Sequence, residues 1–259
     1  MNFIFTEKFV LWLTKILKQL DVSSLRITLF YFFAIAFLSQ CSPSPQTSNI
    51  ENNGISHPTT IKYLALGDSY TIGESVPEPM RWPLQLTDSL IKNGIETEKV
   101  DIIARTGWTT AELKQGIIDN PPSPPYDLVS LLIGVNNQYR GYDIEIYRIE
   151  FRELLEQAIE FANNDSSRVF VVSIPNYGVT PFGQSRGEDK IRKELLEYDR
   201  IAKEIATEYN IPFINITPIS EKAKENLTFI ASDNLHPSGE MYSEWVHEML
   251  PTVLSLIEQ

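Results

Sequence analysis

Four short clusters of polar residues in this 259-residue sequence carry side chains that can act together chemically. They are Gly67-Asp68-Ser69-Tyr70, Arg105-Thr106-Gly107-Trp108, Gly134-Val135-Asn136-Asn137 and Asp233-Asn234-Leu235-His236. Each cluster alone is a weak signal, because a Gly-Asp-Ser turn is common and an aspartate three residues before a histidine arises by chance. Together they supply a hydroxyl, an imidazole beside a carboxylate, and amide N–H groups, which are the parts of nucleophilic catalysis.

Short apolar segments directly precede three of these clusters. Five such segments, rich in β-branched residues, predict strands at residues 61–66, 100–104, 128–133, 169–174 and 211–216. Apolar residues recur at helical spacing over residues 144–162, 191–209 and 241–253. A capping box, Thr109-x-x-Glu112, predicts the start of one more helix.

The alternation of strands and helices predicts the fold class. The strands are too apolar to face water on either side, which favours an α/β three-layer sandwich with a five-stranded parallel sheet between helices. In such sheets the ligand crevice lies beyond the carboxyl ends of the strands. Three of the four clusters stand at such ends, so we expect them to meet there.

Taken in order, the four clusters resemble the motif blocks of the SGNH (GDSL-type) hydrolase family, and the resemblance covers roughly residues 61–250. It implies the family's flavodoxin-like three-layer fold. It also implies that the protein hydrolyses carboxylic esters through an acyl-enzyme. In this sequence it implies Ser69 as the nucleophile, His236 as the base and Asp233 as the partner of that base.

The resemblance also implies an oxyanion hole made by the backbone N–H groups of Ser69 and Gly107 and the side-chain amide of Asn136. Losing one such donor typically lowers the rate by about 10²–10³. The alternative for Gly107 is a purely structural role, as a glycine at the end of a strand. Asn137 stands where the family often has aspartate, at a position that is usually structural.

Elementary chemistry agrees with these implied roles. A serine hydroxyl is a poor nucleophile near neutral pH, so a base must take its proton, and histidine titrates in the right range. Asp233, three residues before His236, can return within one tight turn to hold the Nδ1–H of the ring. For Asp68 we favour a structural role as the cap of its turn.

Other function classes fit less well. An α/β-hydrolase has the same chain order of serine, aspartate and histidine, but Thr71 occupies the place of the last glycine in its Gly-x-Ser-x-Gly elbow. A nucleotide-binding protein would need a glycine-rich phosphate motif that the sequence lacks. A catalytically inactive binding lipoprotein is the non-enzymatic alternative.

The substrate is less constrained than the reaction. We rank a small-acyl or carbohydrate-linked ester first, and a lysophospholipase or thioesterase of the same family as the alternative. Residues 74–81 and 178–188 are the insertions expected to select the substrate. Trp108, Tyr139 and Arg140 flank the clusters and are candidates for lining the pocket.

Composition excludes several partners and cofactors. The net charge of −12 repels phosphate backbones, so we expect no nucleic-acid partner. One cysteine and three histidines leave no Cys-based zinc site and little room for a histidine-rich one, so we expect neither metal nor cofactor. The sequence predicts no particular oligomeric state.

The first 60 residues predict export. Residues 27–38 form an apolar run of 12, the length of a signal-peptide core and too short to span a bilayer comfortably. Leu38-Ser39-Gln40-Cys41 follows and resembles a bacterial lipobox, in which Cys41 is lipidated, although Gln40 replaces the usual small residue. A simple secretory signal and an uncleaved anchor are the alternatives.

The expected organisation follows from these segments. We expect a signal-peptide region at residues 1–40, a flexible tether at 41–60 and one hydrolase domain at 61–259. Lipidation would place that domain in the bacterial cell envelope, anchored to the membrane.

Overall fold

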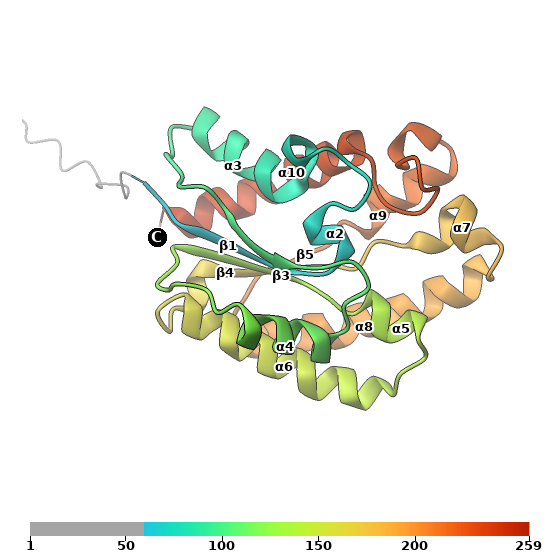
Figure 1. The fold of residues 1–259 in the computed structure, drawn as a ribbon, viewed down its shortest axis with the longest axis horizontal. Coiled ribbons are helices and arrows are strands. Elements are labelled where there is room, and N and C mark those ends of the chain that lie inside the picture. Colours follow the sequence, from blue (N-terminus) through green and yellow to red (C-terminus); the bar gives the residue numbers. More distant parts are fainter. Residues whose placement is uncertain (1–59, 259) are drawn as a thin grey trace, which may run out of the picture. The chain divides into compact units, whose positions relative to one another are not determined.

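A parallel sheet of five strands runs through the centre of the part of the chain that the computed structural model describes, residues 60–258 (Figure 1). The strands are β1 (Tyr63–Gly67), β2 (Asp101–Ala104), β3 (Leu128–Leu132), β4 (Val169–Val172) and β5 (Phe213–Ile214). Their order is β2-β1-β3-β4-β5, and every neighbouring pair is parallel. This is the flavodoxin-like order and confirms the predicted fold class.

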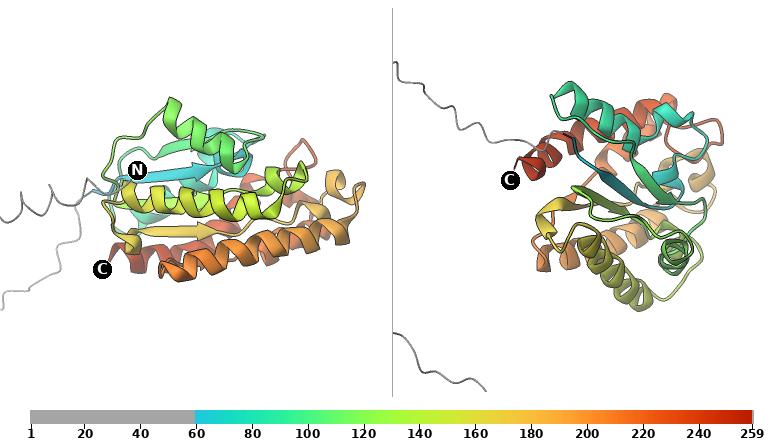
Figure 2. Two further views of the ribbon diagram at one scale, coloured as in Figure 1. Left: turned by 90° about the horizontal axis from the view of Figure 1, so that it is seen from below. Right: turned by 60° about the vertical axis from the view of Figure 1, so that its left-hand side comes forward.

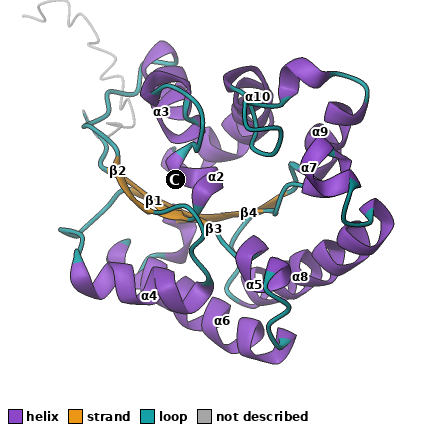
Figure 3. Ribbon diagram, turned by 45° about the vertical axis from the view of Figure 1, so that its right-hand side comes forward, coloured by secondary structure: helices purple, strands orange, loops and turns teal. Residues whose placement is uncertain are grey.

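Helices cover both faces of the sheet, which gives the three layers seen in Figure 3. One face carries α3 (Trp82–Lys92) and α10 (Gly239–Ile257), and the other carries α4 (Thr110–Asp119), α6 (Ile144–Phe161) and α8 (Glu188–Glu208). On the second face α6 and α8 run side by side (Figure 2). The short helices are α2 (Ser69–Ile72), α5 (Val135–Tyr139), α7 (Pro181–Gln184) and α9 (Thr217–Glu221). Single 3₁₀ turns are η1 (Glu78–Met80), η2 (Ser166–Arg168), η3 (Tyr177–Val179), η4 (Lys222–Lys224) and η5 (Leu227–Phe229).

Burial explains why these segments form these elements. Every residue of β1 and β3 is buried, as expected for central strands that helices cover on both sides. In α6 the buried side chains recur at helical spacing, at Tyr147, Phe151, Leu154 and Ala158. The predicted capping box opens α4, with both of its hydrogen bonds formed between Thr109 and Glu112.

Among the strands and the longer helices, α3 and β5 differ most from the sequence-based prediction. Helix α3 was not anticipated; it begins at Trp82-Pro83 and buries Trp82, Leu86 and Leu90. Strand β5 is shorter than the predicted segment 211–216. It ends early because the hydroxyl of Ser173 accepts the backbone N–H groups of Ile216 and Thr217, which removes them from the strand.

The expected signal-peptide region at residues 1–40 and the tether that begins at Cys41 lie outside the described residues, apart from residue 60. Among residues 60–258, no helix combines the length and the apolar character needed to cross a membrane.

Candidate active site

Strand order brings three of the four clusters to one edge of the sheet. Strand β1 lies between β2 and β3, so the segments that follow these strands are neighbours. Ser69 begins α2 directly after β1, Gly107 follows β2, and Asn136 lies in α5 after β3. The chain leaves β1 toward β2 on one side and returns to β3 on the other, and at such a switch point parallel α/β sheets open a crevice.

The fourth cluster is a tight turn in the loop that precedes α10. The Oδ1 atom of Asp233 accepts the backbone N–H groups of Leu235 and His236, each at 2.9 Å, and Asn234 takes a left-handed φ of 63°. The Oδ2 atom of Asp233 lies 2.6 Å from Nδ1 of His236. The carboxylate therefore holds one ring nitrogen, which leaves Nε2 for another partner.

Ser69, Asn136 and His236 line one pocket of about 230 Å³. Ser69 is 4% exposed and His236 is 8% exposed, so both residues are largely shielded from bulk water. Tyr70, the neighbour of Ser69, packs edge-to-face on the His236 ring with a centroid distance of 5.6 Å. Gly107 is not among the residues that line this pocket.

Hydrogen bonds tie the loop after β2 to α5. The Nδ2 atom of Asn136 donates to the carbonyl of Trp108 at 2.9 Å, which uses one of its two N–H groups and leaves the other. The carbonyl of Gly107 accepts from Nη2 of Arg140 at 2.6 Å. Gly107 has a φ of 85°, the left-handed region that favours glycine, so a side chain there would strain the loop.

Comparison with known proteins identifies the family. Residues 65–243 match the model of the GDSL-like lipase/acylhydrolase family. The chain belongs to this family. The match confirms the resemblance seen in the four clusters and supports the expected enzyme class, a carboxylic ester hydrolase.

Individual relatives of this GDSL-like protein are esterases by name. An arylesterase of Vibrio mimicus is 28% identical over 123 residues, which cover 45% of this chain and 58% of the relative. An acetylxylan esterase of Geobacillus stearothermophilus is 24% identical over 141 residues, covering 51% and 62%. The chain thus spans about three fifths of the length of these curated relatives.

A solved structure supports the fold alone. The family 3 carbohydrate esterase of Clostridium thermocellum superposes with a TM-score of 0.59 at 19% identity, covering 76% of this chain and 97% of that one. This agrees with the three-layer arrangement of the GDSL-like fold.

Ser75 lies in the insertion at residues 74–81, but no residue pattern predicts its contact with Asp233. Its hydroxyl donates to Oδ2 of Asp233 at 2.7 Å, from a backbone with a φ of 65°. Burial would raise the pKa of Asp233, but hydrogen bonds from Ser75, His236 and the backbone outweigh it and lower that pKa to about 2. The carboxylate is therefore ionised at any pH at which histidine acts as a base.

Asp68 is a structural residue, as expected. Its Oδ1 atom accepts the backbone N–H of Tyr70 at 3.0 Å and caps α2. The side chain is fully buried, and its Oδ2 atom has no hydrogen-bond partner among residues 60–258. Burial raises the pKa of Asp68 to about 7.

Asn137 is also structural, which accounts for its departure from the family's aspartate. It is fully buried; its Oδ1 accepts the backbone N–H of Thr110 at 3.0 Å, and its Nδ2 donates to the Thr110 hydroxyl at 2.7 Å. That hydroxyl in turn donates to Glu150. An ionised aspartate has no donor for the Thr110 hydroxyl, so the amide suits this position.

Of the aromatic residues that flank the clusters, Trp108 has a packing role and Tyr139 lines the pocket. Trp108 packs its ring against Gly116 of α4, where a side chain would collide with it. Tyr139 lines the pocket that contains Ser69. Within residues 60–258, no group of three or more histidine, cysteine, aspartate or glutamate side chains is placed to hold a metal ion.

Proposed function

We propose that this protein is a serine esterase that uses Ser69, His236 and Asp233 in an acyl-enzyme mechanism. One observation carries the proposal: Asp233 holds one nitrogen of the His236 ring at 2.6 Å, and the ring lines the same pocket as the Ser69 side chain. Serine is activated when a carboxylate orients an imidazole and that imidazole lies in the same pocket as the serine hydroxyl.

In the first half-reaction, Oγ of Ser69 attacks the ester carbonyl carbon while Nε2 of His236 takes its proton. Asp233 keeps the ring in the correct tautomer and stabilises the imidazolium that forms. The carbonyl oxygen becomes negatively charged and accepts N–H groups from Ser69 and Asn136, which line the pocket, and from Gly107, whose loop is held to Asn136 through Trp108. Ser69 suits this role because the first N–H of a helix has no partner inside the helix.

The intermediate then collapses and expels the alcohol, which takes the proton from His236. This leaves the acyl group on Ser69. A water molecule attacks the acyl carbon, His236 takes the proton of that water, and a second tetrahedral intermediate forms. Its collapse returns the proton to Oγ of Ser69 and releases the carboxylic acid.

The size of the pocket favours a small acyl group. Its volume of about 230 Å³ lies below the range of about 300–1,000 Å³ that is usual for sites of drug-sized ligands. The two curated relatives carry the names arylesterase and acetylxylan esterase, which supports a small-acyl or carbohydrate-linked ester as substrate. A long acyl chain would extend beyond this pocket.

A panel of substrates tests the proposal. Purified protein is assayed on p-nitrophenyl esters from acetate to palmitate, on acetylated xylan and on lysophosphatidylcholine, with Ser69→Ala as the control. We expect the highest kcat/KM with the shortest acyl groups and no turnover by Ser69→Ala. Absence of turnover by folded wild type would indicate a binding protein, and a long-chain optimum would indicate a lysophospholipase.

We further propose that the protein is exported and anchored to the bacterial membrane through lipid on Cys41. The lipobox-like segment that ends at Cys41 supports this location. Growth of a bacterial host with radiolabelled palmitate tests it on the full chain. Label is expected in the wild-type protein and absent from Cys41→Ser, and an unlabelled wild type contradicts the proposal.

A further inference from the structure

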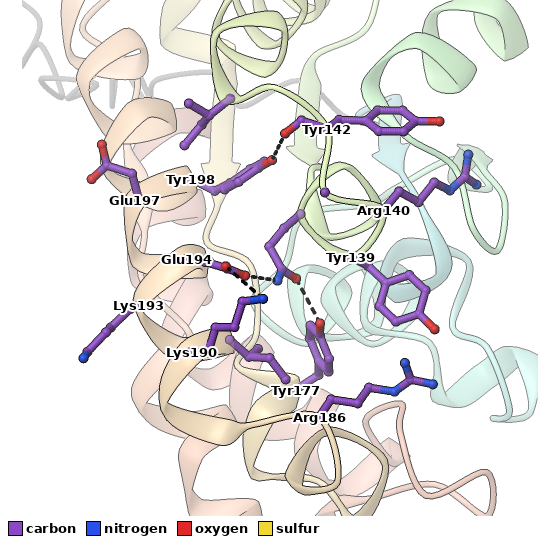
Figure 4. Close-up of a pocket in the computed structure, with 14 residues that line it drawn as sticks. Tyr139, Arg140, Tyr142, Tyr177, Arg186, Lys190, Lys193, Glu194, Glu197 and Tyr198 are labelled. Atoms are coloured by element: carbon purple, nitrogen blue, oxygen red, sulfur yellow. Dashed lines mark hydrogen bonds and ion pairs between the residues drawn. The ribbon is translucent and has the colours of Figure 1, made fainter.

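A groove of about 680 Å³ adjoins the pocket that contains Ser69 (Figure 4). It runs between the end of α5, the loop that leads to α6, and the first half of α8. Tyr139 and Tyr177 line both the groove and the pocket. The two spaces are therefore neighbours that share two lining side chains.

Hydrogen bonds that join η3, α5 and α8 shape the groove before any ligand arrives. The hydroxyl of Tyr177 donates to Oε1 of Gln138 at 3.0 Å, and Nε2 of Gln138 donates to Glu194 at 2.7 Å. Dashed lines that end at Tyr177 and Glu194 mark these two hydrogen bonds in Figure 4. Gln138 and Tyr177 are both at least nine-tenths buried, so their positions are fixed by packing as well.

The groove is richer in cations than in carboxylates. Its charged side chains are Arg140, Arg186, Lys190, Lys193, Glu194 and Glu197. This local excess of positive charge contrasts with the net charge of −12 of the whole chain. A cationic patch on an acidic protein selects for anionic ligands at that place.

Two of the four cations already have carboxylate partners. Arg140 pairs with Glu112, and Lys190 lies 3.8 Å from Glu194. Within the part of the chain that the structure describes, no ion pair involves Arg186 or Lys193.

Arg186 stands where the groove meets the pocket. Its guanidinium lies 5.2 Å from the ring centroid of Tyr139 (Figure 4) and 4.3 Å from that of Phe182. Both rings line the pocket that contains Ser69. Stacking on a ring occupies the flat face of a guanidinium and leaves its in-plane N–H groups available. Those groups match a carboxylate or a phosphate in two-point contact.

We propose that this groove binds the alcohol part of the ester and that Arg186 recognises a carboxylate or phosphate group on that alcohol. The proposal rests on the esterase function proposed above and specifies its substrate. The acyl group occupies the small pocket at Ser69, while the anionic alcohol lies across Tyr139 toward Arg186 and Lys193. An acidic sugar and a phosphate headgroup share this chemistry.

Three acetyl esters with a common phenyl frame test the proposal on the purified protein. They are 4-acetoxybenzoate, 4-acetoxyphenyl phosphate and the neutral 4-acetoxybenzamide. We expect wild type to favour an anionic ester, and we expect the ratio of kcat/KM for that ester to kcat/KM for the amide to fall about tenfold or more in Arg186→Gln, mainly through KM. A preference for carboxylate indicates an acidic sugar, and a preference for phosphate indicates a phosphate headgroup.

Lys203→Gln is the matched control, because it removes the same charge from an exposed position of α8 outside the groove. Its ratio should equal that of wild type. An unchanged ratio in Arg186→Gln, or an equal fall in Lys203→Gln, overturns the proposal. If the enzyme hydrolyses the acetyl ester of the neutral 4-acetoxybenzamide as well as it hydrolyses both anionic esters, the proposal is overturned but the esterase function stands. If it hydrolyses none of the three esters, the esterase function itself is contradicted.

Discussion

The hydroxyl of Ser75 and the side chain of His236 share one carboxylate oxygen, Oδ2 of Asp233, at 2.7 and 2.6 Å. Ser75 comes from the loop after α2, whereas Asp233 belongs to the turn before α10. This hydrogen bond therefore links the segment that carries Ser69, the proposed nucleophile, to the segment that carries His236, the proposed base. Ser75 holds this contact from a left-handed backbone, an uncommon conformation for a residue other than glycine.

Replacing Ser75 by glycine tests whether its hydroxyl positions the carboxylate of Asp233. Without this donor, Asp233 becomes more basic and stabilises the imidazolium more strongly. We expect the acid limb of the pH profile of kcat/KM to move upward by several tenths of a pH unit, and kcat to fall about three- to tenfold as Asp233 loses its fixed position. The measurement is kcat/KM on p-nitrophenyl acetate between pH 4 and 9.

Ser75→Ala separates the hydroxyl from the backbone. Glycine relieves the strain of the left-handed conformation, whereas alanine keeps it. Equal pH shifts in the two variants assign the effect to the hydroxyl. A shift in the alanine variant alone would assign it to the backbone and contradict the positioning role.

Asn136 and Asn137 are adjacent and should respond to alanine in opposite ways. In Asn136→Ala a proposed oxyanion donor is lost, so we expect kcat to fall about 10²–10³ while Tm changes by less than about 3 °C. In Asn137→Ala the buried N–H of Thr110 loses its acceptor, so the free energy of unfolding should fall by roughly 1–3 kcal/mol. Steady-state kinetics and thermal unfolding of both variants check this, and unchanged turnover in Asn136→Ala would remove that residue from the site.

Asp199 makes stability depend on pH. It is buried on α8 and accepts the backbone N–H of Ile174 at 2.9 Å, and burial raises its pKa from 3.8 to about 7. The folded protein thus binds this proton more tightly than the unfolded chain, so the contribution of Asp199 to stability is fully present below about pH 4 and is lost as the pH rises to about 7. Asp199→Asn keeps an acceptor for Ile174 and removes the ionisation.

We therefore expect the Tm of Asp199→Asn, relative to wild type, to rise by about 2–6 °C between pH 4 and pH 8. Scanning calorimetry at several pH values measures it. Asp189→Asn, at an exposed position of the same helix, is the control and should show no such trend. A difference in Tm between Asp199→Asn and wild type that is independent of pH would contradict the ionisation argument.

Periodicity and local turn chemistry made most of the fold predictable. The five strands, the helices α6, α8 and α10, and the capping box at Thr109 all follow from patterns confined to neighbouring residues. The sequence pattern does not predict helix α3, because its start, Trp82-Pro83, follows an insertion and its apolar stripe is short.

The candidate site also contains contacts that can be predicted from the sequence and contacts that cannot. Asp233 and His236 lie three residues apart, so their contact can be predicted from spacing. The contact of Ser75 with Asp233 joins residues 158 positions apart. It depends on the left-handed backbone conformation of Ser75, which no residue pattern predicts. The proposed role of Arg186 likewise depends on rings from α5 and α7 that only the folded chain brings together.

Covalent labelling tests the central claim most directly. Folded wild-type protein is treated with a fluorophosphonate, which captures a serine only where a base removes its proton, and the adduct is located by peptide mass spectrometry. We expect one adduct on Ser69, formed at least about 100-fold more slowly in His236→Gln. An absence of adduct on the folded wild type, or an adduct on another serine with Ser69 unmodified, would contradict the account.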